Sequence, residues 1–105
     1  MAQTLDSALK ERLRAVLDSR PVTEAELRKL ADEGRACELI IAAQLQHAEE
    51  RLAGLSAEPA SSLAEIAATF REVNELQPDL AELRQLLATL TSRAREFRAS
   101  WLSAT

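Results

Sequence analysis

Apolar residues recur every three or four positions along most of this chain, which is the spacing of helices with one buried face. The first such stretch predicts a helix over about residues 5–20, with Thr4 as its N-terminal cap and Pro21 in the turn that follows it. The apolar stripe of this helix consists of Leu5, Leu9, Leu13, Val16 and Leu17.

A second helix is predicted over about residues 24–53. Thr23 can accept a hydrogen bond from the backbone N–H of Glu26, whose side chain can reach back, so the two form a capping box at its start. We interpret Gly54 as its C-terminal stop. Gly34 occupies one slot of the apolar stripe, so another helix approaches closely there or the helix is weakened by about 1 kcal/mol relative to alanine. The other members of the stripe are Leu27, Leu30, Cys37, Ile41, Leu45, Ala48 and Leu52.

A third helix is predicted over about residues 63–102, after a turn that contains Pro59 and with Ser62 and Glu65 as a second capping box. Its apolar steps alternate between three and four, except for two successive steps of three, from Phe70 to Val73 and from Val73 to Leu76. The stripe consists of Leu63, Ile66, Phe70, Val73, Leu76, Leu80, Leu83, Leu87, Leu90, Ala94, Phe97 and Trp101.

Pro78 falls inside this third stretch and leaves two alternatives. Proline is disfavoured inside a helix, and Asp79 with Glu82 could cap a separate fourth helix. Against a break, the residues around Pro78 include no glycine and are too few for a reversal, and the apolar stripe keeps its phase through the proline. We therefore predict one continuous third helix that is kinked at Pro78.

These elements predict an all-α fold in a single domain over residues 1–105. The expected form is an elongated three-helix bundle, in which a long antiparallel helical hairpin carries a short N-terminal helix. In the hairpin, residues whose numbers add to about 116 should lie opposite each other, and in the first helix pair those that add to about 45.

With this pairing, two apolar surfaces are left poorly covered. One is the outer half of the hairpin, where Ile41, Leu45 and Leu52 face Ile66, Phe70 and Val73. The other is the C-terminal end of the third helix, with Ala94, Phe97, Trp101 and Leu102. Exposed apolar patches of this kind usually mark an interface. The alternative is a compact bundle in which the bend at the proline buries both surfaces.

Composition narrows the class of protein. The 105 residues include one cysteine, and the formal net charge is −4, which argues against a general nucleic-acid coat protein. The sequence has neither a secretory signal nor an apolar run that could span a bilayer. A cytoplasmic location is the expectation.

Charge is unevenly distributed along the chain. Residues 49–82 contain eight acidic and two basic side chains, whereas residues 83–105 contain four arginines and one glutamate. Opposite charge at two parts of one chain favours antiparallel self-association or an acidic partner. Ordinary solvated helix faces remain the alternative interpretation.

Candidate chemistry is sparse. His47 and Glu50 lie one helical turn apart, but di-metal helical bundles need two such pairs and further carboxylates, and this chain has a single histidine. Cys37 lies on an apolar stripe, ten residues from that histidine along one helix. No phosphate-binding loop or nucleophile motif occurs. We expect no enzyme activity, no metal and no cofactor.

The expected function is therefore a non-catalytic helical protein–protein interaction module, a scaffold, adaptor or chaperone-like subunit that uses coiled-coil packing. Its partner would be another protein or a second copy of itself, in a dimer or a hetero-complex. The alternative is a small adaptor whose basic C-terminal end binds nucleic acid, which its acidic remainder disfavours, or an anionic membrane. The candidate partner-binding residues are Ile41, Leu45, Leu52, Ile66, Phe70, Val73, Arg93, Phe97, Arg98 and Trp101.

Overall fold

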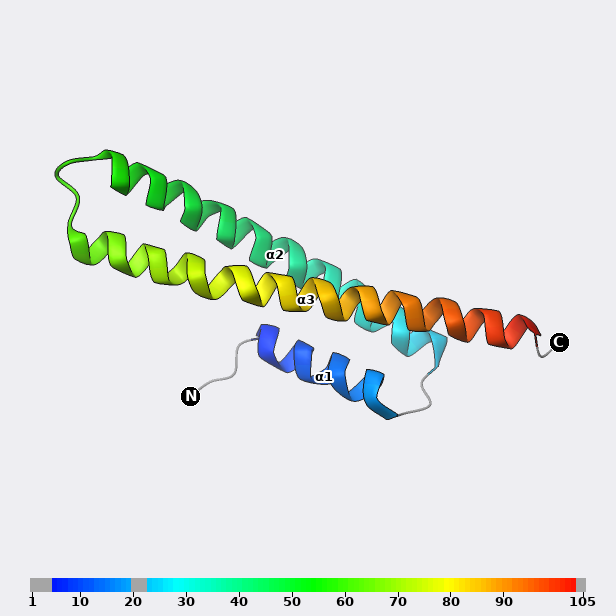
Figure 1. The fold of residues 1–105 in the computed structure, drawn as a ribbon. Helices are drawn as coiled ribbons and strands as arrows, with labels where there is room; N and C mark the ends of the chain where they lie inside the picture. The colour runs from blue at the N-terminus through cyan, green and yellow to red at the C-terminus, as the bar shows by residue number, and fades with distance from the viewer. Residues whose placement is uncertain (1–4, 20–22, 104–105) are drawn as a thin grey trace. The chain divides into compact units, whose positions relative to one another are not determined.

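The computed structural model describes residues 5–19 and 23–103, and all of its regular elements are helices (Figure 1). They are α1 (Leu5–Ser19), α2 (Glu24–Ala57) and α3 (Leu63–Ser103). The predicted all-α, three-helix fold is confirmed, with α2 and α3 as a long antiparallel pair. The predicted cap at Thr4, the end of the first helix at Arg20 and the turn at Pro21 lie outside the described residues.

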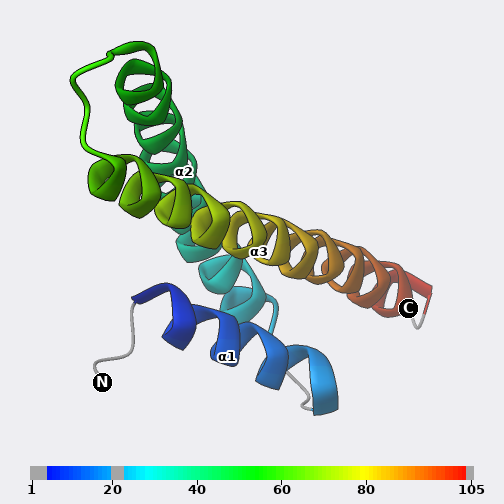
Figure 2. The same ribbon diagram turned by 60° about the vertical axis from the view of Figure 1, so that its left-hand side comes forward.

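The chain divides into two compact units. Unit 1 comprises residues 1–37 and 83–105, and unit 2 comprises residues 38–82. Unit 1 contains α1, the first part of α2 and the last part of α3. Unit 2 is a helical hairpin whose two helices run antiparallel and are joined by the loop between Ala57 and Leu63 (Figures 1 and 2).

The hydroxyl caps predicted for α2 and α3 are present, and the return contacts from Glu26 and Glu65 that would complete each capping box stay predictions. The backbone N–H of Glu26 donates to Thr23 Oγ1 at 3.1 Å, so the threonine cap begins α2 where the sequence predicts. At the start of α3, Ser62 Oγ accepts a hydrogen bond of 3.1 Å from the N–H of Ala64. The serine thus caps the second residue of the helix rather than the third, which is an equally common geometry.

The predicted stop of α2 at Gly54 is wrong, because the helix continues through this glycine to Ala57. Gly54 does not have the positive φ that a helix-terminating glycine adopts. The effective stop is Pro59, since the residue before a proline is disfavoured in the helical conformation. Sequence reasoning favoured the glycine over the stronger signal a few residues further along.

This longer helix shifts the register of the α2–α3 pair. In unit 1 Arg98 pairs with Glu24, and in unit 2 Arg51 pairs with Glu72, so the residue numbers add to 122 and 123. The predicted value of about 116 assumed a reversal centred closer to Gly54.

Unit 1 has a leucine core to which all three helices contribute. Leu13 of α1 and Leu83 of α3 are completely buried. Arg12 and Glu33 form an ion pair of 2.8 Å between α1 and α2, and their numbers add to 45 as predicted. The other buried leucines of unit 1 are Leu9, Leu27, Leu30, Leu87 and Leu90.

Gly34 marks a close approach of α2 to α3 in unit 1. It is buried, and a Cβ atom built on it would lie 3.2 Å from Leu87 Cγ and would overlap Cδ2 of the same side chain. Of the two explanations offered for this glycine, the structure supports close helix approach.

Unit 2 has a thinner core, in which Thr69 takes the place predicted for Phe70. Thr69 is buried and its hydroxyl donates to the Glu65 carbonyl at 2.9 Å, whereas Phe70 is 54% exposed. With Thr69 in place of Phe70, the inner positions of α3 are separated by steps of three and four that alternate without exception. This alternation is the repeat of coiled-coil packing. The inner positions of α3 from Ile66 onward are Ile66, Thr69, Val73, Leu76, Leu80, Leu83, Leu87, Leu90, Ala94, Phe97 and Trp101.

Pro78 lies inside α3, and the helix continues from Leu63 to Ser103 without a break. The structure therefore decides for one continuous third helix over a separate fourth helix. The size of the bend at the proline stays a prediction.

Replacement of Pro78 by alanine should stabilise the protein. Pro78 is exposed and cannot donate the backbone hydrogen bond that an alanine would give to the carbonyl of Asn74. We expect the free energy of unfolding to rise by up to about 3 kcal/mol, with a higher midpoint of thermal unfolding measured by circular dichroism. The neighbouring exposed substitution Gln77→Ala is the control and should change the stability by less than about 0.5 kcal/mol. A lower midpoint for Pro78→Ala would show instead that core packing depends on the bend.

Candidate interaction surface at the C-terminal end of unit 1

An open, largely apolar groove lies where the last turns of α3 pass the first turn of α2. We call it the terminal groove; its volume is about 590 Å³. Its aromatic and aliphatic side chains are strongly exposed: Phe97 by 40%, Trp101 by 67% and Leu102 by 72%. The lining residues are the capping residue Thr23 and Glu24 at the start of α2, with Phe97, Arg98, Trp101 and Leu102 from α3.

The terminal groove is open because the inner stripe of α3 outlasts the described part of α2. Leu90 is buried and Ala94 is half-buried, but the next members of the same stripe, Phe97 and Trp101, are exposed. Glu24, the first residue of α2, is already level with Arg98. The sequence predicted that the apolar side chains at this end extend past the bundle, and for Phe97, Trp101 and Leu102 the structure agrees.

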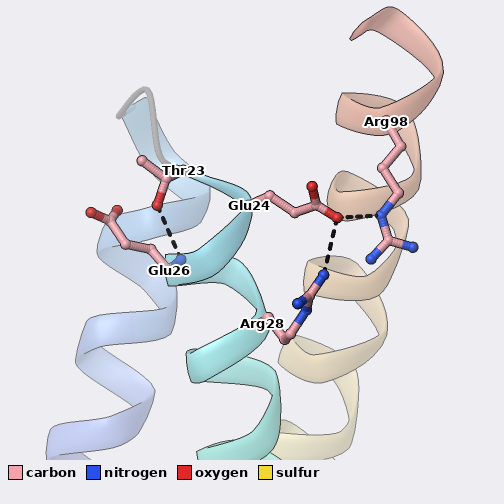
Figure 3. A network of polar contacts seen from close by, with 5 residues as sticks. All are labelled: Thr23, Glu24, Glu26, Arg28 and Arg98. Carbon is pink, nitrogen blue, oxygen red and sulfur yellow. Dashed lines mark hydrogen bonds and ion pairs between the residues drawn. The ribbon is translucent and has the colours of Figure 1, made fainter. Parts of the chain in front are cut away.

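Glu24 holds Arg98 in place beside the terminal groove. Arg98 Nε donates to Glu24 Oε1 at 2.8 Å, and Nη2 of Arg28 reaches the same oxygen at 3.4 Å (Figure 3). Both side chains of the Glu24–Arg98 pair are about half exposed, so the pair contributes at most about 1 kcal/mol to stability. Its effect is mainly geometric, because it fixes an otherwise flexible arginine over the apolar wall.

A second hollow, with a volume of about 360 Å³, lies beside the same ion pair. Glu24 and Arg98 line both hollows, so the ion pair separates an apolar side from a charged side. The charged side is lined by Arg28, Asp32 and Arg35 together with Leu27, Ala31, Leu90, Thr91 and Ala94. A partner that bound across the ion pair would meet apolar and charged surfaces next to each other.

The other predicted partner-binding residues, apart from Arg93, belong to unit 2, and most of them face inward. Ile41 and Val73 are buried, and Leu45, Leu52 and Ile66 are half-buried. These side chains form the hairpin's own core between its two helices, so the expectation that this surface is poorly covered is wrong for Ile41 and Val73, and a partner-binding role for the set stays a prediction. Arg93, in unit 1, is exposed.

The exposed apolar side chains of unit 2 are different ones. Leu39, Ile40 and Leu63 are exposed by 73%, 54% and 84%, and Phe70 joins them. Sequence reasoning placed Leu63 and Phe70 on the inner stripe and did not consider the other two. The available signal was the run of three apolar residues at 39–41, of which a helix can turn only part toward one neighbour.

The described residues offer little for metal or nucleophile chemistry. In residues 5–19 and 23–103, no three His, Cys, Asp or Glu side chains gather closely enough to hold a metal ion. Cys37 is buried in unit 1, and His47 is exposed in unit 2. Across the same part of the chain, no helix has the length and apolar character needed to cross a membrane.

Comparison with family models, with curated proteins and with solved structures finds no significant match to this chain.

Proposed function

We propose that this protein is a non-catalytic helical interaction module that binds a protein segment in the terminal groove. The observation that carries the proposal is the exposure of Phe97, Trp101 and Leu102 together, beside an arginine held in position by Glu24. Tryptophan and arginine are enriched at the centres of protein interfaces, where burial of a large rigid side chain contributes most of the binding energy.

The charge of the surrounding helix defines the partner further. Residues 83–105 carry four arginines against one glutamate, and both Arg93 and Arg95 are exposed. A segment with apolar anchors and acidic side chains would complement this surface, and the charges would speed its association more than they would strengthen the complex. The role fits a scaffold, adaptor or chaperone-like subunit in a reducing, cytoplasmic setting, which suits a chain with a single cysteine, Cys37.

Nucleic acid or an anionic membrane is the second candidate, because arginines and aromatic residues alternate over 93–101. The ion pair disfavours it. Arg98 is already engaged by Glu24, and the carboxylates of Glu24 and Glu26 stand at the start of α2, where they would repel a phosphate group.

A peptide-display selection against the immobilised protein tests the proposal. We expect enrichment of sequences with apolar anchors and acidic flanks on the wild type, and at least about a tenfold loss of binding with Trp101→Ala. Leu39→Ala is the matched control, since it removes an equally exposed apolar side chain from unit 2.

The fluorescence of Trp101, the only tryptophan, then reports on the terminal groove. A selected peptide should shift the emission to the blue, and the shift should persist at physiological salt because apolar burial dominates. If duplex DNA or acidic vesicles caused the shift instead, and if salt or the pair Arg93→Glu and Arg95→Glu abolished it, the second candidate would replace the first.

A further inference from the structure

The two units carry opposite net charge. Unit 2 has nine acidic and two basic side chains, a formal charge of −7, whereas the segments of unit 1 have eleven basic and eight acidic side chains, a formal charge of +3. The excess in unit 1 comes from residues 83–105, the segment that forms one wall of the terminal groove. Each copy of the chain therefore contains both a basic α3 segment beside the terminal groove and an acidic unit 2.

Unit 2 also presents apolar anchors at the spacing that a groove can bind. Leu63, Ala67 and Phe70 are all exposed, and steps of four and three place them on one side of α3. We call these three residues the hairpin face. Helices that bind in apolar grooves use anchors at these intervals. Arg71, the basic residue next to this face, folds back along its own helix, with Nε 3.4 Å from the Ala67 carbonyl.

From these observations we propose that the partner of the terminal groove is a second copy of this chain. The hairpin face of one copy lies in the terminal groove of the other, so that Phe70 and Leu63 pack against Phe97 and Trp101. This inference rests on the proposed function, and it names the partner. Charge complementarity between the +3 and −7 units favours this pairing and opposes groove-to-groove or hairpin-to-hairpin contact.

Two copies can form this groove-to-hairpin contact twice. When they are related by a twofold axis, the groove of each copy binds the hairpin face of the other, and the assembly closes as a dimer. Repetition of a single contact from copy to copy would instead give an open chain. Both assemblies require the same two surfaces, and a variant that loses either surface should lose self-association.

Sedimentation equilibrium on the full chain is the first test. We expect the wild type to self-associate, and we expect association to weaken by about thirtyfold or more in a groove variant, Phe97→Ala with Trp101→Ala. A hairpin variant, Leu63→Ala with Phe70→Ala, should show the same loss.

The matched control is Leu39→Ala with Ile40→Ala. It removes comparably exposed apolar side chains about 20 Å further along the hairpin and should leave association unchanged. Circular dichroism should show full helicity in all three variants, because each substitution puts the strong helix former alanine at an exposed site.

Mixing the two defective variants identifies which surfaces meet. The groove variant keeps an intact hairpin face, and the hairpin variant keeps an intact groove, so together they can make one of the two contacts. Only the hairpin variant contains tryptophan, so the emission of Trp101 reports solely on its groove. We expect its emission to shift to the blue when the groove variant is added, and not when more of the hairpin variant is added.

A wild type that stays monomeric at high micromolar concentration would overturn the inference, as would a mixture that fails to restore association. Loss of association in the Leu39 and Ile40 control would overturn it too. These failures differ from failure of the proposed function: a monomer that still enriches peptides in a Trp101-dependent way remains an interaction module with a different partner.

Discussion

Gly34→Leu is expected to destabilise the protein by about 3 kcal/mol, near the upper end of the range for overpacked cores. Even a single Cβ atom at this position would overlap Leu87, which is itself buried and has little room to move. The gain in helix propensity, up to about 1 kcal/mol, offsets only part of this cost. Urea unfolding followed by circular dichroism should show a lower midpoint with an unchanged slope.

Two further variants test whether this contact is the cause. In the double variant Gly34→Leu with Leu87→Ala, the volume lost from α3 makes room for the new side chain, so the two effects should be non-additive by about 1 kcal/mol or more. Gly54→Ala is the matched control, because nothing lies within 4 Å of a Cβ at that position. It should stabilise α2 by roughly 0.5–1 kcal/mol, the opposite sign. Equal effects at the two glycines would contradict the close approach of α2 and α3.

Leu13→Ala is expected to destabilise the protein by about 3 kcal/mol or more. Leu13 is fully buried in unit 1, and its truncation loses apolar burial and leaves a cavity against α2 and α3. The 15 residues of α1 are too few to form a stable helix alone, so α1 depends on this packing.

Hydrogen exchange should locate the effect of Leu13→Ala. The amides of α1 are expected to lose protection first, before those of unit 2, and the midpoint of urea unfolding should fall. Leu39→Ala removes the same side chain from an exposed position, so it should stay within about 0.5 kcal/mol of the wild type. A comparable loss from both leucines would mean that α1 does not pack through Leu13.

The helices could be predicted from the sequence because their signals are local. Apolar spacing and the caps at Thr23 and Ser62 act within a few residues, and they placed both helix starts correctly. The end of α2 was placed too early, at Gly54, because a glycine stops a helix only when its φ becomes positive, and the local sequence does not show which φ Gly54 adopts; Pro59 was the better signal.

The inner face of α3 shows how one position can mislead. Phe70 is the more hydrophobic of two neighbours, so pattern reasoning placed it inside, yet the buried residue is Thr69, whose hydroxyl is satisfied by the carbonyl of Glu65. A buried threonine is inexpensive when its hydroxyl bonds within its own helix. Strict alternation of three and four would have been the better guide.

The terminal groove was only partly predictable. Phe97 and Trp101 could be identified because the apolar stripe outlasts its expected cover. The Glu24–Arg98 pair, however, depends on the register of α2 against α3, and that register depends on where α2 ends. The error at the end of α2 therefore shifted the predicted α2–α3 pairs, whereas the α1–α2 pair Arg12–Glu33 was unaffected.

The division of the chain into a continuous and a discontinuous unit affects the order of folding. Unit 2 is one uninterrupted segment of low contact order, whereas contacts in unit 1 join distant parts of the chain, as Glu24 and Arg98 do across 74 residues. Closing a flexible loop of that length costs roughly 4 kcal/mol of chain entropy. If the hairpin forms first, it replaces most of that loop with ordered helix, and a smaller entropic cost remains when unit 1 closes. The topology therefore favours a folding nucleus in the middle of the chain, with the two chain ends joining it last.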